Sequence, residues 1–302
     1  MALKTGRADG TADVRIDRDR CNACGLCLTV CKGMPLYRDG DGIGVDQSRI
    51  FGCIGCGQCM AVCPRECIYV TGRSLAPGDM VPMPPKERRA GYDQLRNLMI
   101  SRRSVRDFRD DPVDRGLTEK IIAAASTSPM GLPPSDVEVL VLEGRDSVME
   151  FAGFAVDFMR KIKWLFSPAM LLIMRPFMSR EDYDSSRTFL RPVIDFITDR
   201  RNSGEDWLLY GAPLAMYFHS SPYSDPVDPV IPATYAMLAA ESLGLGSCMI
   251  GTIAFIVKYS SRIRRKYGIP GKNRHGVMVI FGHPRVKYKR AIKRTFARVD
   301  FR

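Results

Sequence analysis

Apolar and polar positions alternate at the two ends of the first part of the chain. Val14 and Ile16 are separated by a charged residue near the start, and Ile68 and Val70 are separated by a tyrosine near the end. Alternation with a period of two residues is typical of strands with one buried face. The pattern predicts a short antiparallel pairing of these two segments, which closes a small first domain over residues 12–72.

A stretch rich in proline and glycine follows this first domain. Between Gly72 and Pro85 the chain contains four prolines and one further glycine before its next regular pattern. Such a composition resists both helix and sheet and is typical of a stiff linker. We therefore place a linker at residues 73–91 and a larger domain at residues 92–302.

The larger domain shows both helical and strand periodicity. The pattern predicts helices at 92–101, at 117–126 with Thr118 as the cap, and at 233–243, and strands at 137–142, 214–219 and 276–282. Residues 128–135 and 221–232 are rich in turn residues, and 147–201 are helical in character and rich in Met and Phe. Helices that flank a modest sheet imply an α+β fold.

The only long apolar run lies at residues 164–174 and is flanked by Lys161, Lys163 and Arg175. Its eleven residues are fewer than the ~20 that span a bilayer. We expect a buried helix or a flap over a site, with contact to a membrane surface as the alternative. Residues 1–20 are polar and charged, without the apolar core of an export signal.

Charge is concentrated at the end of the 302-residue chain. Residues 262–302 contain 14 Lys or Arg and one acid, Asp300, whereas the whole chain has a net charge of +12. A positive surface attracts phosphates or acidic proteins. Nucleic acid is not expected, because no recognised binding module accompanies the charge. A solvated face, or a tail laid across a partner subunit, is the alternative interpretation.

Eight of the ten cysteines follow one pattern twice. Each copy has the spacing C-x2-C-x2-C-x3-C, and the two copies are offset by 32 residues at all four positions. Three closely spaced thiolates can wrap three corners of an iron–sulfur cube, while the fourth is carried away on the next helical turn. Structural zinc, the alternative, usually takes two separated C-x2-C pairs. Cysteines spaced as metal ligands also indicate a protein of the reducing cytoplasm, and not one held together by disulfides.

From Val14 to Val70 the chain resembles bacterial two-cluster ferredoxins. In these proteins the fourth cysteine of each run ligates the other cluster. Lys32 departs from the proline that often follows the first run, and Cys67 lies outside the pattern as a small buried residue. The resemblance implies two [4Fe-4S] clusters, one held by Cys21, Cys24, Cys27 and Cys63, the other by Cys53, Cys56, Cys59 and Cys31.

A second set of motifs lies in the larger domain. Arginines at 102, 103 and 106 surround Ser104, a cluster that suits a bound phosphate. Three further motifs follow in order: an SPMG turn at 128–131, a GLGSC segment at 244–248 and a GIPG turn at 268–271. Neither G-x-G-x-x-G after a strand nor a P-loop occurs, so no nucleotide fold of those two kinds is indicated.

In this order and spacing the motifs resemble the nitroreductase superfamily of FMN-dependent oxidoreductases, over about residues 92–290. The family's asparagine and glutamine after the turn are replaced here by Pro133 and Ser135, so polar contacts to flavin must differ. The resemblance implies FMN contacts from Arg102, Arg103, Ser104 and Arg106, from Ser128, Pro129, Met130 and Gly131, from Leu245, Gly246 and Ser247, and from Lys289 or Arg290.

The chain offers no candidate catalytic side chain, because its three histidines are isolated and its carboxylates form no recognisable pair. Flavin-based chemistry fits this, since a cofactor carries the redox step. The resemblance implies a homodimeric oxidoreductase that takes electrons from a ferredoxin or flavodoxin. They would pass through the clusters to FMN, which reduces a nitroaromatic, quinone or activated alkene. The alternative is a non-catalytic electron relay or redox-sensing subunit that acts on a protein partner.

Overall fold

The computed structural model describes residues 5–8 and 10–302, and it divides into two compact units. The first unit contains the cysteine-rich part of the chain up to Arg89, together with Pro129–Glu138 and Ser220–Asp228. The second contains Ala90–Ser128, Val139–His219 and Pro229–Arg302.

The ends of the cysteine-rich segment pair as expected. Strand β1 (Asp13–Ile16) is antiparallel to β4 (Ile68–Thr71), with Val14 opposite Val70 and Ile16 opposite Ile68. Val14 and Val70 are buried, because alternate side chains of a strand point to the same face. The predicted pairing is confirmed.

Two short helices and a hairpin lie between these strands. Helices α1 (Leu26–Val30) and α2 (Gln58–Val62) pack against each other, and β2 (Leu36–Asp39) forms an antiparallel hairpin with β3 (Gly42–Val45). Two single 3₁₀ turns follow β4, at Pro77–Asp79 and Lys86–Arg88. The hairpin was not predicted from the sequence.

The second unit is built on a four-stranded sheet in the order β5-β6-β8-β7. Its strands are β5 (Val137–Glu143), β6 (Leu214–Ser220), β7 (Gly246–Ile250) and β8 (His275–Gly282). The last two are antiparallel. Three strands were predicted within one residue at either end. The strand β7 was missed, because its glycine-containing sequence resembles a helix end followed by a turn.

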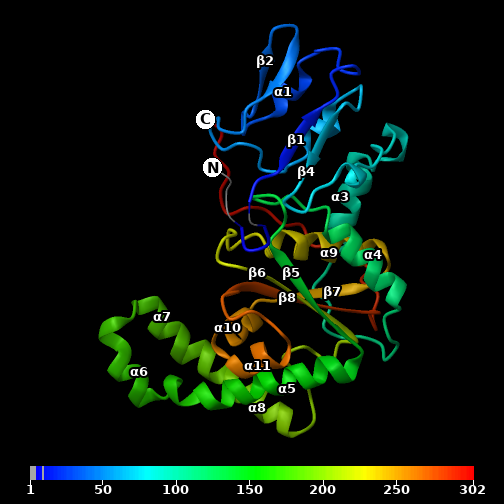
Figure 1. The fold of residues 1–302 in the computed structure, drawn as a ribbon. Coiled ribbons are helices and arrows are strands. Elements are labelled where there is room, and N and C mark those ends of the chain that lie inside the picture. Colours follow the sequence, from blue (N-terminus) through cyan, green and yellow to red (C-terminus); the bar gives the residue numbers. More distant parts are fainter. Residues whose placement is uncertain (1–4, 9) are drawn as a thin grey trace. The chain divides into compact units, whose positions relative to one another are not determined.

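Helices cover both faces of this sheet (Figure 1). Helix α9 (Val230–Ser242) packs on β7 and β8 and contacts α3 (Tyr92–Ser101) and α4 (Arg115–Ala125). On the other face α10 (Thr252–Tyr259) packs on β8, and α5 (Arg145–Ile162) contacts α8 (Arg191–Asn202), α10 and α11 (Ser261–Lys266). This arrangement confirms the α+β prediction.

Two helix starts differ from the sequence prediction. Asp114, and not Thr118, caps α4, because its carboxylate accepts a hydrogen bond from the Gly116 backbone N–H at 2.8 Å. Thr118 is buried inside the helix. Helix α9 begins three residues before the predicted 233, so the Pro-rich loop is shorter than expected.

The apolar run and the residues that follow it fold into short helical pieces. They are η3 (Lys163–Phe166), α6 (Pro168–Met174), η4 (Arg175–Phe177), α7 (Arg180–Ser185) and the π-helical turn η5 (Ser186–Leu190). Leu171 is the only buried residue of α6, whereas Leu172, Ile173 and Phe177 are exposed by 62%, 65% and 89%. The expectation of a buried helix is therefore wrong, and the flap stays a prediction. Within the described chain, no helix combines the length and apolarity that a membrane crossing requires.

Candidate functional site

The eight patterned cysteines of the first unit line two separate cavities. Each cavity combines three thiols of one copy with the fourth thiol of the other copy, which is the grouping that the sequence predicted. One cavity is lined by Cys21, Cys24, Cys27 and Cys63, and the other by Cys31, Cys53, Cys56 and Cys59. The structure thus brings each expected ligand set together, and ligation itself stays a proposal.

The crossing of the fourth thiols follows from the ends of the two short helices. Gly25 and Gly57 precede α1 and α2 with φ of 78° and 71°, a left-handed conformation that glycine adopts without strain. Cys31 and Cys63 follow the same helices as extended C-cap residues. Their side chains therefore leave the helical path, and each lines the cavity of the opposite copy.

Burial works against free thiolates in these cavities. It raises the pKa of Cys27 and of Cys53, and it raises the pKa of Cys59 to about 12, with nearby thiols adding to the effect. At Cys63 burial is outweighed by backbone N–H groups, among them that of Cys67, so its pKa is lowered. Iron can supply the positive charge that buried thiolates need, so the donor set fits an iron–sulfur cluster.

The described residues contain no group of three or more His, Cys, Asp or Glu side chains arranged around a single metal ion. This is compatible with the two thiol-lined cavities. A single zinc ion draws its sulfur ligands to about 2.3 Å, whereas a cube spreads four thiolates over four irons.

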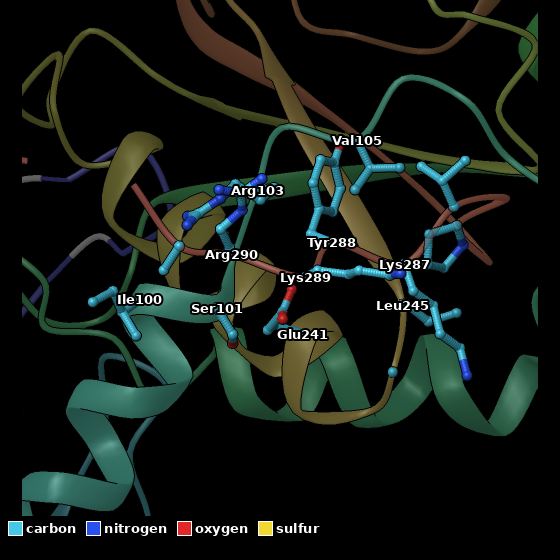
Figure 2. Close-up of a pocket in the computed structure, with 14 residues that line it drawn as sticks. Ile100, Ser101, Arg103, Val105, Glu241, Leu245, Lys287, Tyr288, Lys289 and Arg290 are labelled. Atoms are coloured by element: carbon cyan, nitrogen blue, oxygen red, sulfur yellow. The ribbon is translucent and has the colours of Figure 1, made fainter. Parts of the chain in front are cut away.

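A basic cavity of about 450 Å³ lies in the second unit (Figure 2). Four cations line it, and Glu241 is the one acid among its lining residues, so the wall carries a net positive charge. The cations are Arg103, Lys287, Lys289 and Arg290. Leu245, Val105 and Tyr288 contribute apolar surface. The cavity thus combines a cationic wall with an apolar one, as a phosphorylated aromatic group requires.

The wall around Arg103 is held by strand β7. Ser104 and Ser247 form a parallel bridge, and the Val105 N–H donates to the Ser247 carbonyl at 3.0 Å. A Cβ on Gly246 would come within 2.7 Å of the Val105 side chain. Glycine is therefore needed at 246 for this packing, a reason other than the expected approach to a flavin ring.

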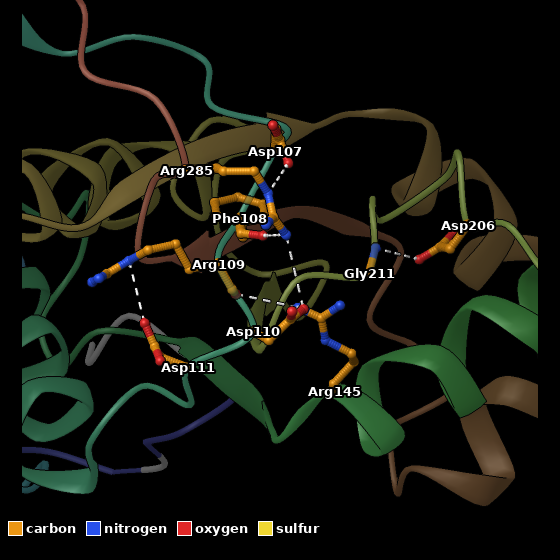
Figure 3. A network of polar contacts seen from close by, with 9 residues as sticks. All are labelled: Asp107, Phe108, Arg109, Asp110, Asp111, Arg145, Asp206, Gly211 and Arg285. Atoms are coloured by element: carbon orange, nitrogen blue, oxygen red, sulfur yellow. Dashed lines mark hydrogen bonds and ion pairs between the residues drawn. The ribbon is translucent and has the colours of Figure 1, made fainter.

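The start of the basic tail is held in place by contacts of Arg285 with Asp107 and Phe108 (Figure 3). Arg285 is ion-paired with Asp107, with 3.0 Å between Nε and Oδ1, and its Nη2 donates to the Phe108 carbonyl at 2.8 Å. Backbone bonds add to this: the Arg285 N–H donates to the Asp107 carbonyl, and the Arg109 N–H to the His283 carbonyl. The anchored residue lies two positions before Lys287, so it determines where the cations of the tail begin.

In the segments around Arg103, three buried polar atoms have no hydrogen-bond partner within the described chain. They are Nη1 of Arg102, Nη2 of Arg103 and Oγ of Ser247. Arg103 lines the cavity, whereas Arg102 and Ser247 adjoin that segment along the chain and through the bridge to Ser104. A buried donor without a partner is costly, so these groups fit a ligand with several acceptor oxygens. A bound phosphate would supply partners for these buried polar atoms. The residues present therefore fit FMN, which carries a phosphate.

The other predicted flavin residues have different positions. Ser104 and Arg106 line a second cavity of about 750 Å³, to which Tyr288 also contributes. Ser128 belongs to the second unit and Pro129–Gly131 to the first, so their contact with flavin stays a prediction. Sequence reasoning missed Lys287 and Tyr288, although their place in the basic tail was a signal.

The second cavity has a mixed polar wall held by one carboxylate. Asp206 Oδ1 accepts from the N–H groups of Leu208 and Leu209, and its Oδ2 accepts from that of Gly211 at 3.0 Å. The pKa of the neighbouring Glu205 is lowered, first by the indole N–H of Trp207 and then by an arginine. The loop that lines this cavity is therefore fixed from within.

Comparisons with known proteins agree with this architecture. Residues 13–64 match the 4Fe-4S dicluster domain, and residues 99–283 match the Nitroreductase family. The two matches define the class, an oxidoreductase that combines an iron–sulfur domain with a nitroreductase domain. The second match covers more than half of the chain, and the chain belongs to the nitroreductase family. No curated protein matches it.

Solved nitroreductase structures resemble the second part of the chain, and the first of them shows the same fold. A nitroreductase with bound FMN from Desulfitobacterium hafniense DCB-2 is 20% identical, with a TM-score of 0.50, and the match covers 68% of this chain and 98% of that one. A nitroreductase with bound FMN from Bacteroides fragilis NCTC 9343 is 17% identical, with a TM-score of 0.46 and coverage of 68% and 99%. An FMN-dependent nitroreductase from Clostridium difficile R20291 is 17% identical, with a TM-score of 0.46 and coverage of 69% and 99%.

Proposed function

We propose that this protein is an iron–sulfur flavoprotein that carries electrons from a low-potential donor through two [4Fe-4S] clusters to FMN and on to an organic acceptor. The donor is a ferredoxin or flavodoxin, and the acceptor is a nitroaromatic, a quinone or an activated alkene. The proposal also includes a homodimer and a reducing compartment such as the cytoplasm.

The unpartnered donors beside the basic cavity carry the proposal. Among the described residues, Arg102, Arg103 and Ser247 bury polar atoms without hydrogen-bond partners, and the tail adds three cations to the wall that Arg103 lines. Charge-assisted hydrogen bonds to a phosphate satisfy such groups with good geometry. The FMN named for the solved nitroreductases supplies a phosphate of this kind.

Each set of residues has a distinct task in this proposal. Arg103, Lys289 and Arg290 hold the phosphate, and the apolar wall at Leu245 keeps water from the ring. When bound, FMN exchanges electrons singly or in pairs, whereas the clusters exchange single electrons. The protein supplies orientation and electrostatics.

The surface around the clusters suits a protein donor. Cys24 and Cys56, one from each thiol set, are exposed, so each cavity has an edge at the surface. An exposed edge shortens the distance to a docked electron donor. In the second unit, the cations of the tail that do not line the basic cavity would attract an acidic protein partner.

The test is an anaerobic reoxidation experiment. The holoprotein is reduced with stoichiometric dithionite and mixed with a nitroarene, a quinone or an enone, while the visible spectrum is followed. We expect rapid reoxidation of flavin and clusters by one acceptor class. Iron and FMN contents are measured on the same sample, so that absent cofactors are distinguished from an unreactive flavin.

Two outcomes contradict parts of the proposal. Reoxidation by none of the acceptors, with both cofactors present, contradicts the reductase and favours a relay to a protein partner. Iron or FMN that does not copurify and cannot be reconstituted contradicts the cofactor assignment itself.

A further inference from the structure

The two thiol-lined cavities differ at one repeat-related position. The offset of 32 residues relates Cys63 to Cys31 and, four residues further, Cys67 to Pro35. Cys67 lines the cavity of Cys21, Cys24, Cys27 and Cys63, whereas Pro35 lines the other cavity. One cavity therefore has a fifth thiol where the other has a ring without any hydrogen-bond donor.

The fifth thiol lies in hydrogen-bond contact with Cys63, one expected ligand, and it also interacts with Cys21 of the same cavity. Cys67 Sγ is 3.5 Å from Cys63 Sγ, and Cys67 is only 2% exposed. When Cys63 binds iron it is a thiolate, which has no proton to donate. The S–H of Cys67 is then the donor and the sulfur of Cys63 the acceptor. The shielding from water leaves this contact without competition from solvent.

We propose that Cys67 is not a ligand but donates a hydrogen bond to the Cys63 thiolate, and thereby makes the reduction potential of that cluster more positive. Hydrogen bonds to cluster sulfurs withdraw electron density and so stabilise the reduced state. This inference rests on the proposed cluster assignment and deepens it, because it gives the two centres different environments.

The other centre has a different neighbour. Arg73 is 6% exposed and packs against Gly55, in the loop between Cys53 and Cys56. Its guanidinium donates to the carbonyls of Gly10 and Pro133. A buried cation acts on the potential of that centre through its charge. The proposal therefore concerns the change that Cys67 causes in its own centre, and not the order of the two potentials.

The experiment is a redox titration of the holoprotein, followed by electron paramagnetic resonance, on wild type, Cys67→Ala and Cys67→Ser. We expect Cys67→Ala to keep the wild-type iron content and to shift the midpoint of one centre to a more negative potential, leaving the other unchanged. Cys67→Ser keeps an O–H donor and returns the midpoint towards the wild-type value. Cys248→Ala, which removes a buried thiol of the second unit, is the matched control.

Three results overturn the inference. They are unchanged midpoints in Cys67→Ala, equal shifts of both centres, and a loss of iron as large as that of a ligand variant such as Cys59→Ala. A wild-type protein without about eight irons per chain instead contradicts the underlying cluster assignment. Iron analysis thus distinguishes the two failures.

A second variant keeps the test decisive if Cys67→Ala does not fold. Pro35→Cys places a thiol at the equivalent position of the other cavity. The midpoint of the other centre is then expected to become more positive, while the first centre stays unchanged. An unchanged midpoint in a Pro35→Cys protein with full iron content counts against the hydrogen-bond mechanism.

Discussion

The thiol-lined cavities and the basic cavity are assembled in opposite ways. Each thiol set comes from residues 21–63. The spacing of the cysteines along the chain predicts which three thiols lie together, and the crossing of Cys31 and Cys63 adds the fourth. The basic cavity combines residues 100–105, 241–245 and 284–291, which are brought together by the bridge between Ser104 and Ser247 and by the pairing of β7 with β8. A local site is therefore readable from spacing, whereas a composite site depends on the sheet.

The comparison makes a strong prediction for the local site. Replacing Cys59 by Ala removes one of four thiols from its cavity, so we expect about half of the iron to be lost, because one cube needs its full set of ligands. FMN content should stay at the wild-type level, and donor-driven turnover should fall to near background. Iron, sulfide and flavin analysis check this.

Cys248→Ala is the control for this variant, since it removes a buried thiol that lies outside both cavities. Unchanged iron in Cys59→Ala, at wild-type folding, contradicts the assignment of Cys59 as a ligand.

For the composite site, replacing Arg103 by Ala should weaken FMN binding without changing the iron content. A hydrogen bond to a charged group contributes about 1.5–3 kcal/mol, which corresponds to a loss of affinity of roughly 10- to 100-fold. Fluorescence titration of the FMN-free protein with FMN measures this affinity. Arg298→Ala, in the exposed end of the tail, controls for net charge, and equal affinities in the two variants speak against the phosphate role.

The register of the composite site is tested at Gly246. An added methyl group would meet the Val105 side chain, so Gly246→Ala should destabilise the second unit by about 1–3 kcal/mol, the usual cost of overpacking. Chemical denaturation of the variant measures the loss. Val105→Ala in the same chain should recover part of it, and a purely additive double variant would show that the two positions do not touch.

The smallest effect is expected at the anchor of the tail. Arg285→Ala leaves every lining residue in place but removes the ion pair to Asp107 and the bond to the Phe108 carbonyl. The Arg285 side chain is about half exposed. We therefore expect the free energy of FMN binding to weaken by roughly 0.5–1.5 kcal/mol. This corresponds to an FMN affinity about 2- to 10-fold weaker. The dissociation rate of FMN at two salt concentrations checks it, and a change as large as that of Arg103→Ala would show direct contact.

The outcome for the sequence predictions follows the same division. The pairing of Val14 with Val70 was predictable because alternation reports a buried face directly. The strand at 246–250 was not predictable, because Gly244, Gly246 and the short apolar run after them also fit a turn. Only the pairing with β8 shows that the segment is a strand. Arg103, Lys289 and Arg290 were predicted for one site by family resemblance, and the structure brings them to one cavity.

The long-range positions of the tail show the limit of local patterns. A run of cations reads as a solvated face, and nothing near Arg285 in the sequence indicates Asp107 as its partner, 178 positions away. The exposure of Ile173 and Phe177 was also not predictable, because an apolar run does not report whether another surface covers it. Tertiary contacts decide both cases.

Tyr288 lines both the basic cavity and the second cavity. The residue is therefore common to both cavities, and it is 55% exposed. A compound that displaces Tyr288 in the larger cavity would change the lining of the smaller one. Inhibition measured at this protein should then show mutual interference between compounds that never touch each other, a behaviour set by one side chain.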